Sequence, residues 1–292
     1  MELQSLDQLF SVILSFALIN GLINISYYLN NKKFKYINNK SINFFLIFFL
    51  ITNFIAVSTF IFSITLGVNK GLINVLSIFI VLLGFYKPFY FREFKFFFLK
   101  DKYHLIIMIL ILSYLLLSTA PISDNDSLDY HITVPLYSLK FGEHFFTNYW
   151  VHSELSGTGE SLLMFGASIG AYHFGQVMQF ISLLFLVIII FNFSYKGFFK
   201  YNNNNIIILS ILLIPSLIFL CSTSKFQLFP AVSNFLCLLI AVFYFDQIKK
   251  KQSIILFTAI TFLLMATTQM KFSFFLSSGL ITFILFYEMY KK

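Results

Sequence analysis

The sequence predicts an all-α membrane protein, a polytopic bundle of about nine transmembrane helices. Of its 292 residues, 59% are hydrophobic and only 11% are charged, and the mean hydropathy is +0.84. A soluble domain of this length cannot cover so much apolar surface with polar residues. Apolar runs long enough to cross a bilayer recur along the chain, and basic residues collect between alternate runs.

Nine apolar runs account for the predicted spans, some of them only just long enough. They cover residues 9–29, 43–67, 72–90, 104–120, 160–194, 206–222, 228–246, 253–269 and 272–290. The fifth run is too long for one span. We expect it to hold a shorter helix at 160–172, a break near Gly175 and a span at 176–194.

The charges between the runs orient the predicted bundle. The basic segments contain Lys32, Lys33, Lys35 and Lys40; Lys87, Arg92, Lys95, Lys100 and Lys102; Lys196 and Lys200; Lys249, Lys250 and Lys251; and Lys291 and Lys292. Because basic loops stay in the cytoplasm, we expect a protein of the plasma (inner) membrane with its N-terminus outside and its C-terminus inside. The acidic opening, with Glu2 and Asp7, agrees with that orientation.

The same pattern excludes other classes of protein. The net charge of +8 lies in loop clusters, so it does not indicate nucleic-acid binding. The two cysteines, Cys221 and Cys237, fall in apolar runs without metal-ligand spacing, and we expect buried thiols. The N-terminus has neither a basic region nor a small-residue cleavage site, so it resembles a first membrane helix more than a removable signal.

One long hydrophilic loop, 121–160, is predicted on the outer side, with short amphipathic helices. It holds half of the twelve acidic residues and three of the five histidines, His131, His144 and His152. Asp124 or Asp126 can cap a helix that runs through LDYHI and is kinked or ended by Pro135. At α-helical spacing, Asp126, Asp129 and Tyr130 share one face. Ser156 or Thr158 can cap a second helix, with Glu160 in its first turn.

Asp126 is the strongest catalytic candidate, with Asp124 and Asp129 as its neighbours. A carboxylate near the membrane surface can take the proton of an acceptor hydroxyl as that oxygen attacks. Burial beside other carboxylates would make it a stronger base. Capping and loop solvation are the structural alternative for all three residues.

Metal and histidine chemistry remain open alternatives in this loop. Asp124-Asn-Asp126 forms a D-x-D whose oxygen atoms suit Mg²⁺ or Mn²⁺, although no nucleotide-binding βαβ unit precedes it. His131 adjoins the acidic turn and can bond a substrate hydroxyl or phosphate. The loop histidines lack the spacing of zinc ligands. His104 and His173, near helix ends, fit an interfacial position.

Two lysines fall at predicted outer helix ends, where lysines are scarce. They are Lys225 in STSKFQLFP and Lys271 in TTQMKFSFF. Either ammonium can hold the phosphate of a lipid-linked donor. The alternative is that they extend to lipid headgroups without a specific ligand.

The motifs taken together resemble a known superfamily. An acidic D-x-x-x-Y turn, Asp126 to Tyr130, is followed by a Pro, then a Gly in LKFGE, then the acid-led helix GTGESLLMFGASIG. This order is similar to that of the GT-C integral-membrane glycosyltransferases, in particular bacterial relatives of the protein mannosyltransferase and aminoarabinose transferase group. The resemblance implies inverting transfer of a sugar from a polyprenyl-phosphate donor, with an outer-loop carboxylate as acid/base.

The resemblance assigns roles to loop residues. Asp126 matches the leading Asp of the family's D-E-x-x-Y, and Tyr130 matches its Tyr. Ser127 stands where a Glu is usual, so Asp129 or Asp124 would supply the second carboxylate. Glu160 matches an acid that often opens the helix after the loop.

Two later segments also match. TSKFQLFPAVSNFLCLL contains Lys225 and has Gln227 where the family often has an Asp. ATTQMKFSFF resembles a segment in which a Lys precedes small hydroxyl residues, here Lys271 and Ser273. Tyr130, His131, Glu160, Lys225 and Lys271 are therefore the expected substrate-binding residues.

The resemblance covers about 115–290. We expect residues 1–120 to form an N-terminal four-helix extension and residues 121–292 a GT-C-like core with the outer loop 121–160 and about five spans. Family members usually have more helices, so the chain fits a divergent or partial member. The expected function is sugar transfer from a polyprenyl-phosphate donor to a glycan, lipid or protein acceptor, amid membrane lipid. No cofactor is expected, with Mg²⁺ or Mn²⁺ as the alternative.

A competing class is a non-enzymatic transporter or assembly partner for lipid-linked glycans. A transporter would place ionisable groups deep within its helices, whereas these spans carry almost no charge. A glycan polymerase of the O-antigen type would need Arg-rich outer loops. The one arginine here, Arg92, is predicted to be cytoplasmic.

Overall fold

The structure is all-helical in the residues it describes. The computed structural model describes residues 2–32, 37, 39–87, 102–144, 157–194, 204–244 and 250–290, and no strand occurs in them. The helices are α1 (Glu2–Lys32), α2 (Lys40–Thr65), α3 (Lys70–Tyr86), α4 (Lys102–Ser118), η3 (Ser127–His131), α5 (Thr133–Phe141), α7 (Thr158–Ser168), α8 (Phe174–Ser194), α9 (Asn204–Leu212), α10 (Pro215–Ser222), α11 (Leu228–Phe243), α12 (Lys250–Met270), η6 (Phe272–Phe274) and α13 (Phe275–Tyr290).

Four helices are long and apolar enough to cross a membrane, so the chain is a candidate membrane protein. These stretches are Leu6–Asn31, Lys40–Thr65, Phe174–Asn192 and Phe272–Tyr290. A fifth candidate is the pair Asn205–Leu212 and Pro215–Ser222, which is bent by 63°. Proline at the first position of α10 suits a helix start because its missing N–H has no intrahelical partner there. The other apolar helices among these residues, α3, α4, α11 and the end of α12, have 10–17 residues, so nine spans stay a prediction.

The fifth apolar run divides as expected, but earlier in the chain. A short helix, α7, ends at Ser168, and α8 begins at Phe174. The break lies at 169–173, where Gly170 adopts a left-handed backbone with φ of 79°. The break predicted near Gly175 thus lies a few residues earlier, and Gly175 itself is inside α8.

The two short helices in the acidic loop are present, and Asp124, one of the two predicted caps, begins the first. The Asp124 carboxylate accepts from the N–H of Ser127, and a π-helical turn, η3, follows. A π-helical turn is wider than an α-helical turn. The α-helical spacing that predicted one shared face for Asp126, Asp129 and Tyr130 therefore does not apply here. α5 then starts at Thr133, so Pro135 lies in a first turn, where it costs no hydrogen bond.

The second loop helix is capped by a glutamate. The N-cap of α7 is Gly157, whose N–H donates to Glu160 Oε2 at 2.7 Å. Thr158 is the first helical residue, so the predicted cap at Thr158 was wrong; Ser156 lies outside the described residues. The Glu160 carboxylate thus satisfies one of the free N–H groups at this helix start.

Aromatic packing holds the middle of the bundle together. Phe185 of α8 contacts Phe45 and Phe48 of α2, each with ring centroids 4.9 Å apart. Phe229 of α11 lies 5.0 Å from Phe49 of α2. All of these rings are fully buried, so α2, α8 and α11 share one core.

α1 and α3 approach each other closely through glycine. A Cβ atom at Gly21 would collide with the carbonyl oxygen of Ile80, and one at Gly84 would collide with that of Ala17. Asn24 of α1 also donates to the carbonyl oxygen of Leu83 at 2.9 Å. Small residues that let two helices touch at the backbone are typical of packing between membrane helices.

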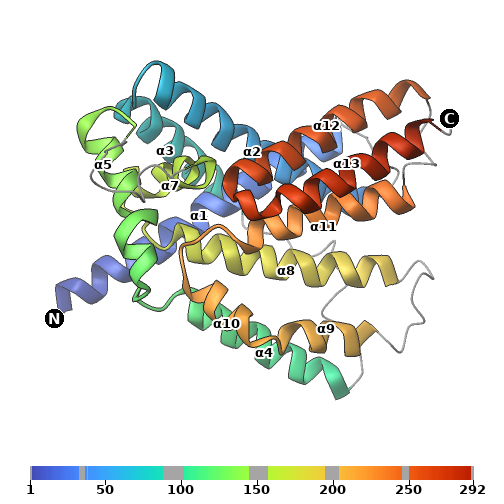
Figure 1. Cartoon of the computed structure of the whole chain (residues 1–292). Helices are drawn as coiled ribbons and strands as arrows, with labels where there is room; N and C mark the ends of the chain where they lie inside the picture. Colours follow the sequence, from blue (N-terminus) through green and yellow to red (C-terminus); the bar gives the residue numbers. More distant parts are fainter. Residues whose placement is uncertain are drawn as a thin grey trace.

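The bundle has two ends of different character (Figure 1). At one end, where α5 and α7 lie, Val68 N–H donates to the Gly142 carbonyl at 2.6 Å. At the other, where α13 ends, Asn39 donates to the Tyr244 hydroxyl at 2.9 Å. The acidic loop belongs to the first end, called here the acidic end. This arrangement positions the candidate site.

Candidate functional site

Four segments from distant parts of the chain meet at the acidic end. They are the stretch 124–131 with η3, the start of α7, the linker 223–227 between α10 and α11, and the turn at Lys271 between α12 and η6 (Figure 1). A Cβ atom at Gly157 would lie 2.6 Å from the Gln269 carbonyl oxygen, so α7 starts directly against the end of α12. Hydrogen bonds and ion pairs join the remaining segments.

Lys225 is the centre of an ion-pair cluster. Its Nζ lies 2.6 Å from Asp126 Oδ2 and 3.4 Å from Asp124 Oδ2. The lysine side chain is only 9% exposed, and its ammonium also lies 4.9 Å from the centre of the Phe219 ring. Two carboxylates and an aromatic face together compensate for removing this charge from water.

The backbone around Lys225 is held by a glutamine in the core of the bundle. Gln179 of α8 donates from its Nε2 to the Lys225 carbonyl. Its Oε1 accepts from the N–H groups of Leu228 and Phe229, at 2.9 and 3.1 Å. One fully buried amide thus satisfies backbone hydrogen-bonding groups of both the linker and the start of α11. It also fixes the position of the Lys225 backbone, from which the side chain extends.

A serine joins the linker to η3. The N–H of Ser224 donates to Ser127 Oγ at 3.0 Å, and Ser127 Oγ donates to Asp124 Oδ2 at 2.9 Å. Asp124 therefore has two roles, the cap of the η3 turn and a partner of Lys225. Ser127, which departs from the glutamate of the resembled motif, contributes this link instead.

A second pair is more deeply buried. His131 Nδ1 lies 2.7 Å from Glu160 Oε1, and their side chains are 10% and 6% exposed. The other carboxylate oxygen of Glu160 accepts from Gly157 N–H. The Tyr130 ring lies beside the imidazole, with ring centroids 3.9 Å apart. This Glu160–His131 pair joins the loop to α7.

Tyr130 is held in its neutral form. Burial raises the pKa of its hydroxyl to about 12, and the negative charges of nearby carboxylates add to that shift. Those carboxylates are Glu160, Asp126, Asp124 and Asp129. The phenol therefore remains a hydrogen-bond donor at ordinary pH. Asp129 itself is exposed.

Lys271 is the second cation of the site. Among the described residues, its ammonium forms neither a hydrogen bond nor an ion pair. Burial lowers the pKa of its ammonium, repulsion from Lys225 lowers it further, and attraction to Asp126 and Glu160 opposes both. A cation with this environment gains from binding an anion.

The structure thus brings together all eight sequence-predicted site residues through contacts or electrostatic coupling, and Asp129, which is exposed, takes part only through the effect of its charge on Tyr130. Two details of the prediction were wrong. Asp126 is not buried among carboxylates, because its side chain is 60% exposed and bonded to Lys225. Lys225 does not extend towards lipid headgroups, because it is buried in that same ion pair.

The D-x-D motif holds an ammonium where a metal would be expected. Lys225 Nζ lies between Asp124 and Asp126, so a divalent cation could use both carboxylates only if the lysine moved away. Among the residues that the structure describes, no group of three His, Cys, Asp or Glu residues could hold a metal ion. The other loop histidine in this part of the chain, His144, contacts Ser63 Oγ at 3.4 Å.

Three buried hydroxyls in the segments around the site were not predicted from the sequence. Thr158 Oγ1, Ser161 Oγ and Ser224 Oγ are fully buried, and within the described chain they have no hydrogen-bond partner. Gln179 was missed as well, because it lies in an apolar run that reads as a plain span. Its spacing of three residues from Gln176 on one helix was the available signal, since such a pair marks a polar stripe on a buried face.

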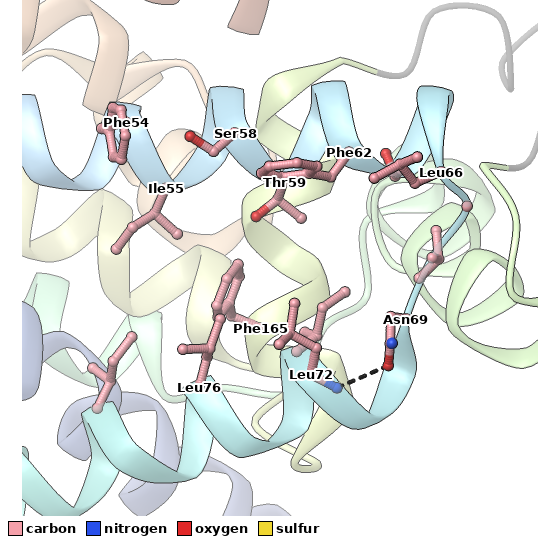
Figure 2. A pocket seen from close by; sticks show the side chains of 15 residues that line it. Phe54, Ile55, Ser58, Thr59, Phe62, Leu66, Asn69, Leu72, Leu76 and Phe165 are labelled. Atoms are coloured by element: carbon pink, nitrogen blue, oxygen red, sulfur yellow. Dashed lines mark hydrogen bonds between the residues drawn. The ribbon is translucent and has the colours of Figure 1, made fainter.

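An apolar cavity of about 520 Å³ lies between α2 and α3 (Figure 2). Phe54, Phe62 and Leu72 are among its lining residues, and Phe165 of α7 points into it from the side. α7 carries Glu160 in its first turn and Phe165 five residues later, about 7.5 Å further along the helix axis. The same helix therefore contacts both the charged cluster and the cavity.

The fold and the site define a class of protein, an all-helical protein with several helices that could span a membrane and a charged cluster at one end of the bundle. The family model described as the DUF1420 N-terminal domain matches residues 5–290, so the chain belongs to the DUF1420 family. No curated protein and no solved structure matches the chain. The resemblance to GT-C glycosyltransferases therefore stays a prediction.

Proposed function

We propose that the protein is a membrane glycosyltransferase that moves a sugar from a polyprenyl-phosphate donor to an acceptor hydroxyl. One observation carries the proposal. Carboxylates, an imidazole and two lysines from four separate segments gather at a single end of a bundle of apolar helices. Phosphate binding and proton removal both need such groups, and the substrate's lipid tail needs an apolar surface beside them.

Lys271 is the residue proposed to hold the donor's phosphate. Its ammonium has no ion pair among the described residues, whereas Lys225 already contacts two carboxylates. As the bond between sugar and phosphate breaks, the phosphate gains a negative charge. A fixed ammonium nearby stabilises that charge, and Tyr130 can donate a further hydrogen bond.

The cavity between α2 and α3 is proposed to take part of the donor's isoprenoid chain. It is lined mainly by apolar side chains, and Phe165 joins it to the helix that carries Glu160 (Figure 2). A polyprenyl phosphate likewise consists of an apolar chain that ends in one charged group, so the cavity would face the chain and the charged cluster would face the phosphate. The cavity is too small for the whole chain, so the remaining units would lie in the bilayer.

The proposal includes a topology. About nine spans in the plasma (inner) membrane place the N-terminus and the acidic end outside, and the C-terminus in the cytoplasm. The basic residues that flank the opposite end, such as Lys40 and Lys87, support this orientation through the positive-inside rule. The polar ends of lipid-linked sugars would then meet the charged cluster at headgroup depth.

The test uses the full-length protein in lipid nanodiscs. Undecaprenyl phosphates that carry single radiolabelled hexoses or pentoses are supplied with crude envelope glycans, lipids and proteins as acceptors. The expected result is release of undecaprenyl phosphate with transfer of label for at least one sugar. Asp126→Asn and Lys271→Met should each lower the rate at least tenfold, and Lys140→Met, an exposed lysine on the nearby α5, should leave it unchanged.

If no donor is consumed by the wild-type protein, the transferase proposal fails. A non-enzymatic role with lipid-linked glycans would then be the better explanation. It would be tested by binding of the same labelled donors to the nanodiscs. Full activity of Lys271→Met would remove only the phosphate assignment.

A further inference from the structure

We propose that His131 is the base that removes the acceptor's proton, and that Glu160 is the positioning residue that prepares it. This inference rests on the proposed function and deepens it, because it names a catalytic group in the same site. The resemblance assigns proton removal to Asp126 instead. The geometry of the Glu160–His131 pair favours the histidine.

The hydrogen bonds of Glu160 determine where the imidazole carries its proton. Oε2 of the carboxylate accepts from the N–H of Gly157 at the start of α7, and Oε1 lies 2.7 Å from His131 Nδ1. An ionised carboxylate can only accept hydrogen bonds. The neutral imidazole must therefore carry its proton on Nδ1, which leaves the lone pair on Nε2.

Nε2 is available for a substrate. No hydrogen bond to it is formed within the described residues, and the His131 side chain keeps 10% of its surface exposed. The adjacent Tyr130 ring, 3.9 Å away between centroids, restricts how the imidazole can rotate. A base held in one orientation by a carboxylate behind it is the arrangement that general-base catalysis requires.

Asp126 has a different task in this arrangement. Its Oδ2 lies 2.6 Å from Lys225 Nζ, and its side chain is 60% exposed. The Asp126 oxygen that could take a proton is already bonded to an ammonium, whereas within the described residues no hydrogen bond occupies His131 Nε2. We assign Asp126 to holding Lys225, and so to the packing of the linker 223–227 against η3.

The proposed step is a displacement at the anomeric carbon of the donor sugar. The acceptor oxygen forms a bond to the anomeric carbon of the sugar, and its proton moves to His131 Nε2. The bond from that carbon to the phosphate oxygen breaks, and its electron pair leaves with the polyprenyl phosphate. Glu160 stabilises the imidazolium that results, and Lys271 stabilises the new phosphate charge.

The first measurement reads the tautomer without any substrate. The protein is labelled with ¹⁵N-histidine, and the His131 signals are assigned by their loss in His131→Gln. We expect protonated Nδ1 and unprotonated Nε2 in the wild type. In Glu160→Gln we expect a mixture, because an NH₂ group replaces one of the two accepting carboxylate oxygens and cannot accept from Gly157 N–H or from the imidazole. A wild-type imidazole protonated on Nε2 would overturn the inference.

The second measurement is release of undecaprenyl phosphate in the assay above. His131→Gln keeps a donor for Glu160 but lacks a base, so kcat should fall by about 10²–10⁴-fold while the KM for the donor stays within about twofold. Asp126→Asn should lose less than His131→Gln. Reaction of a thiol dye with the buried Cys221 and Cys237 checks that each variant is folded.

The outcomes separate the two proposals. If the wild type consumes no donor, the proposed function fails and the catalytic assignment falls with it. If the wild type turns over and His131→Gln keeps the same kcat, the transferase stands and only the assignment of His131 is wrong. If Asp126→Asn is the more damaging change, Asp126 is the base.

Discussion

Lys225 makes polar contacts at the acidic end through both its side chain and its backbone. Its ammonium joins Asp124 and Asp126 to a linker that begins almost one hundred positions later in the chain. Its carbonyl is bonded to Gln179, so the side chain and the backbone are fixed together. Such a buried cation supports the local structure only while its carboxylates are present.

Lys225→Met is expected to destabilise the protein. The change leaves Asp124, which is 17% exposed, without its cation, and the cost should be about 1–3 kcal/mol because Asp126 is exposed enough to regain water. The measurement is thermal unfolding followed by reaction of a thiol dye with the two buried cysteines. Lys140→Met, an exposed lysine, is the matched control and should unfold at the wild-type temperature. Equal midpoint temperatures of unfolding for Lys225→Met and Lys140→Met would contradict a structural role of the ion pair.

Residue types at the site could be predicted from the sequence, but their partners could not. Acid and lysine in an apolar chain are conspicuous, so Asp126, Glu160 and Lys271 were recognisable as candidates. The bonds between Lys225 and Asp126, or between His131 and Glu160, join positions far apart in the chain. No local pattern encodes such pairs, because they depend on how the helices pack.

At the scale of elements, the contact between α1 and α3 is set by two glycines. Gly21 and Gly84 let each helix approach the other's backbone, and a single methyl group at either would meet a carbonyl oxygen. A backbone carbonyl group within a helix cannot rotate away from such a clash as a side chain can. The pair of helices must therefore separate to accommodate any larger residue.

Gly84→Ala is expected to lower stability despite alanine's higher helix propensity. Separating α1 from α3 should cost about 1–3 kcal/mol, more than the gain of about 1 kcal/mol from propensity. Gly279→Ala in α13 is the control, because a Cβ there meets nothing within 4 Å. Unfolding in detergent, read by thiol labelling, should place Gly84→Ala below the wild type and Gly279→Ala at or above it. The reverse order would show that the close approach does not limit stability.

Helix positions were predictable from apolar runs, and helix starts were less so. Each of the nine predicted apolar runs overlaps at least one described helix. The π-helical turn η3 and the glutamate cap of α7 were not foreseen, because both depend on side chains that choose among competing backbone partners. The break before α8 lies a few residues earlier than predicted, at the left-handed Gly170.

At the scale of the whole molecule, helix ends gather at opposite ends of the bundle (Figure 1). At the end opposite the acidic end, the Lys87 ammonium lies over the Tyr27 ring. At the acidic end, Gly142 contacts Val68. Alternate connections therefore face the same side. That arrangement is what a polytopic protein needs if its basic loops are to remain in the cytoplasm.

Single cysteines at exposed positions test the proposed orientation. Lys140→Cys should react with a membrane-impermeant maleimide on intact spheroplasts, and Lys87→Cys should react only after permeabilisation. Cys221 and Cys237 are buried and should stay unlabelled in both variants. Labelling of Lys87→Cys alone from outside would invert the topology and end the case for chemistry at the outer face.

The contact between Asp126 and Lys225 spans 99 positions of the chain. Because ribosomes release residues in order, the carboxylate exists long before its cation has been translated, and Lys271 follows later still. A nascent chain interrupted between residues 160 and 225 would carry the acidic groups without either lysine. The ion pairs of Lys225 can therefore form only after residue 225 has been translated, and Lys271 can join the cluster only later.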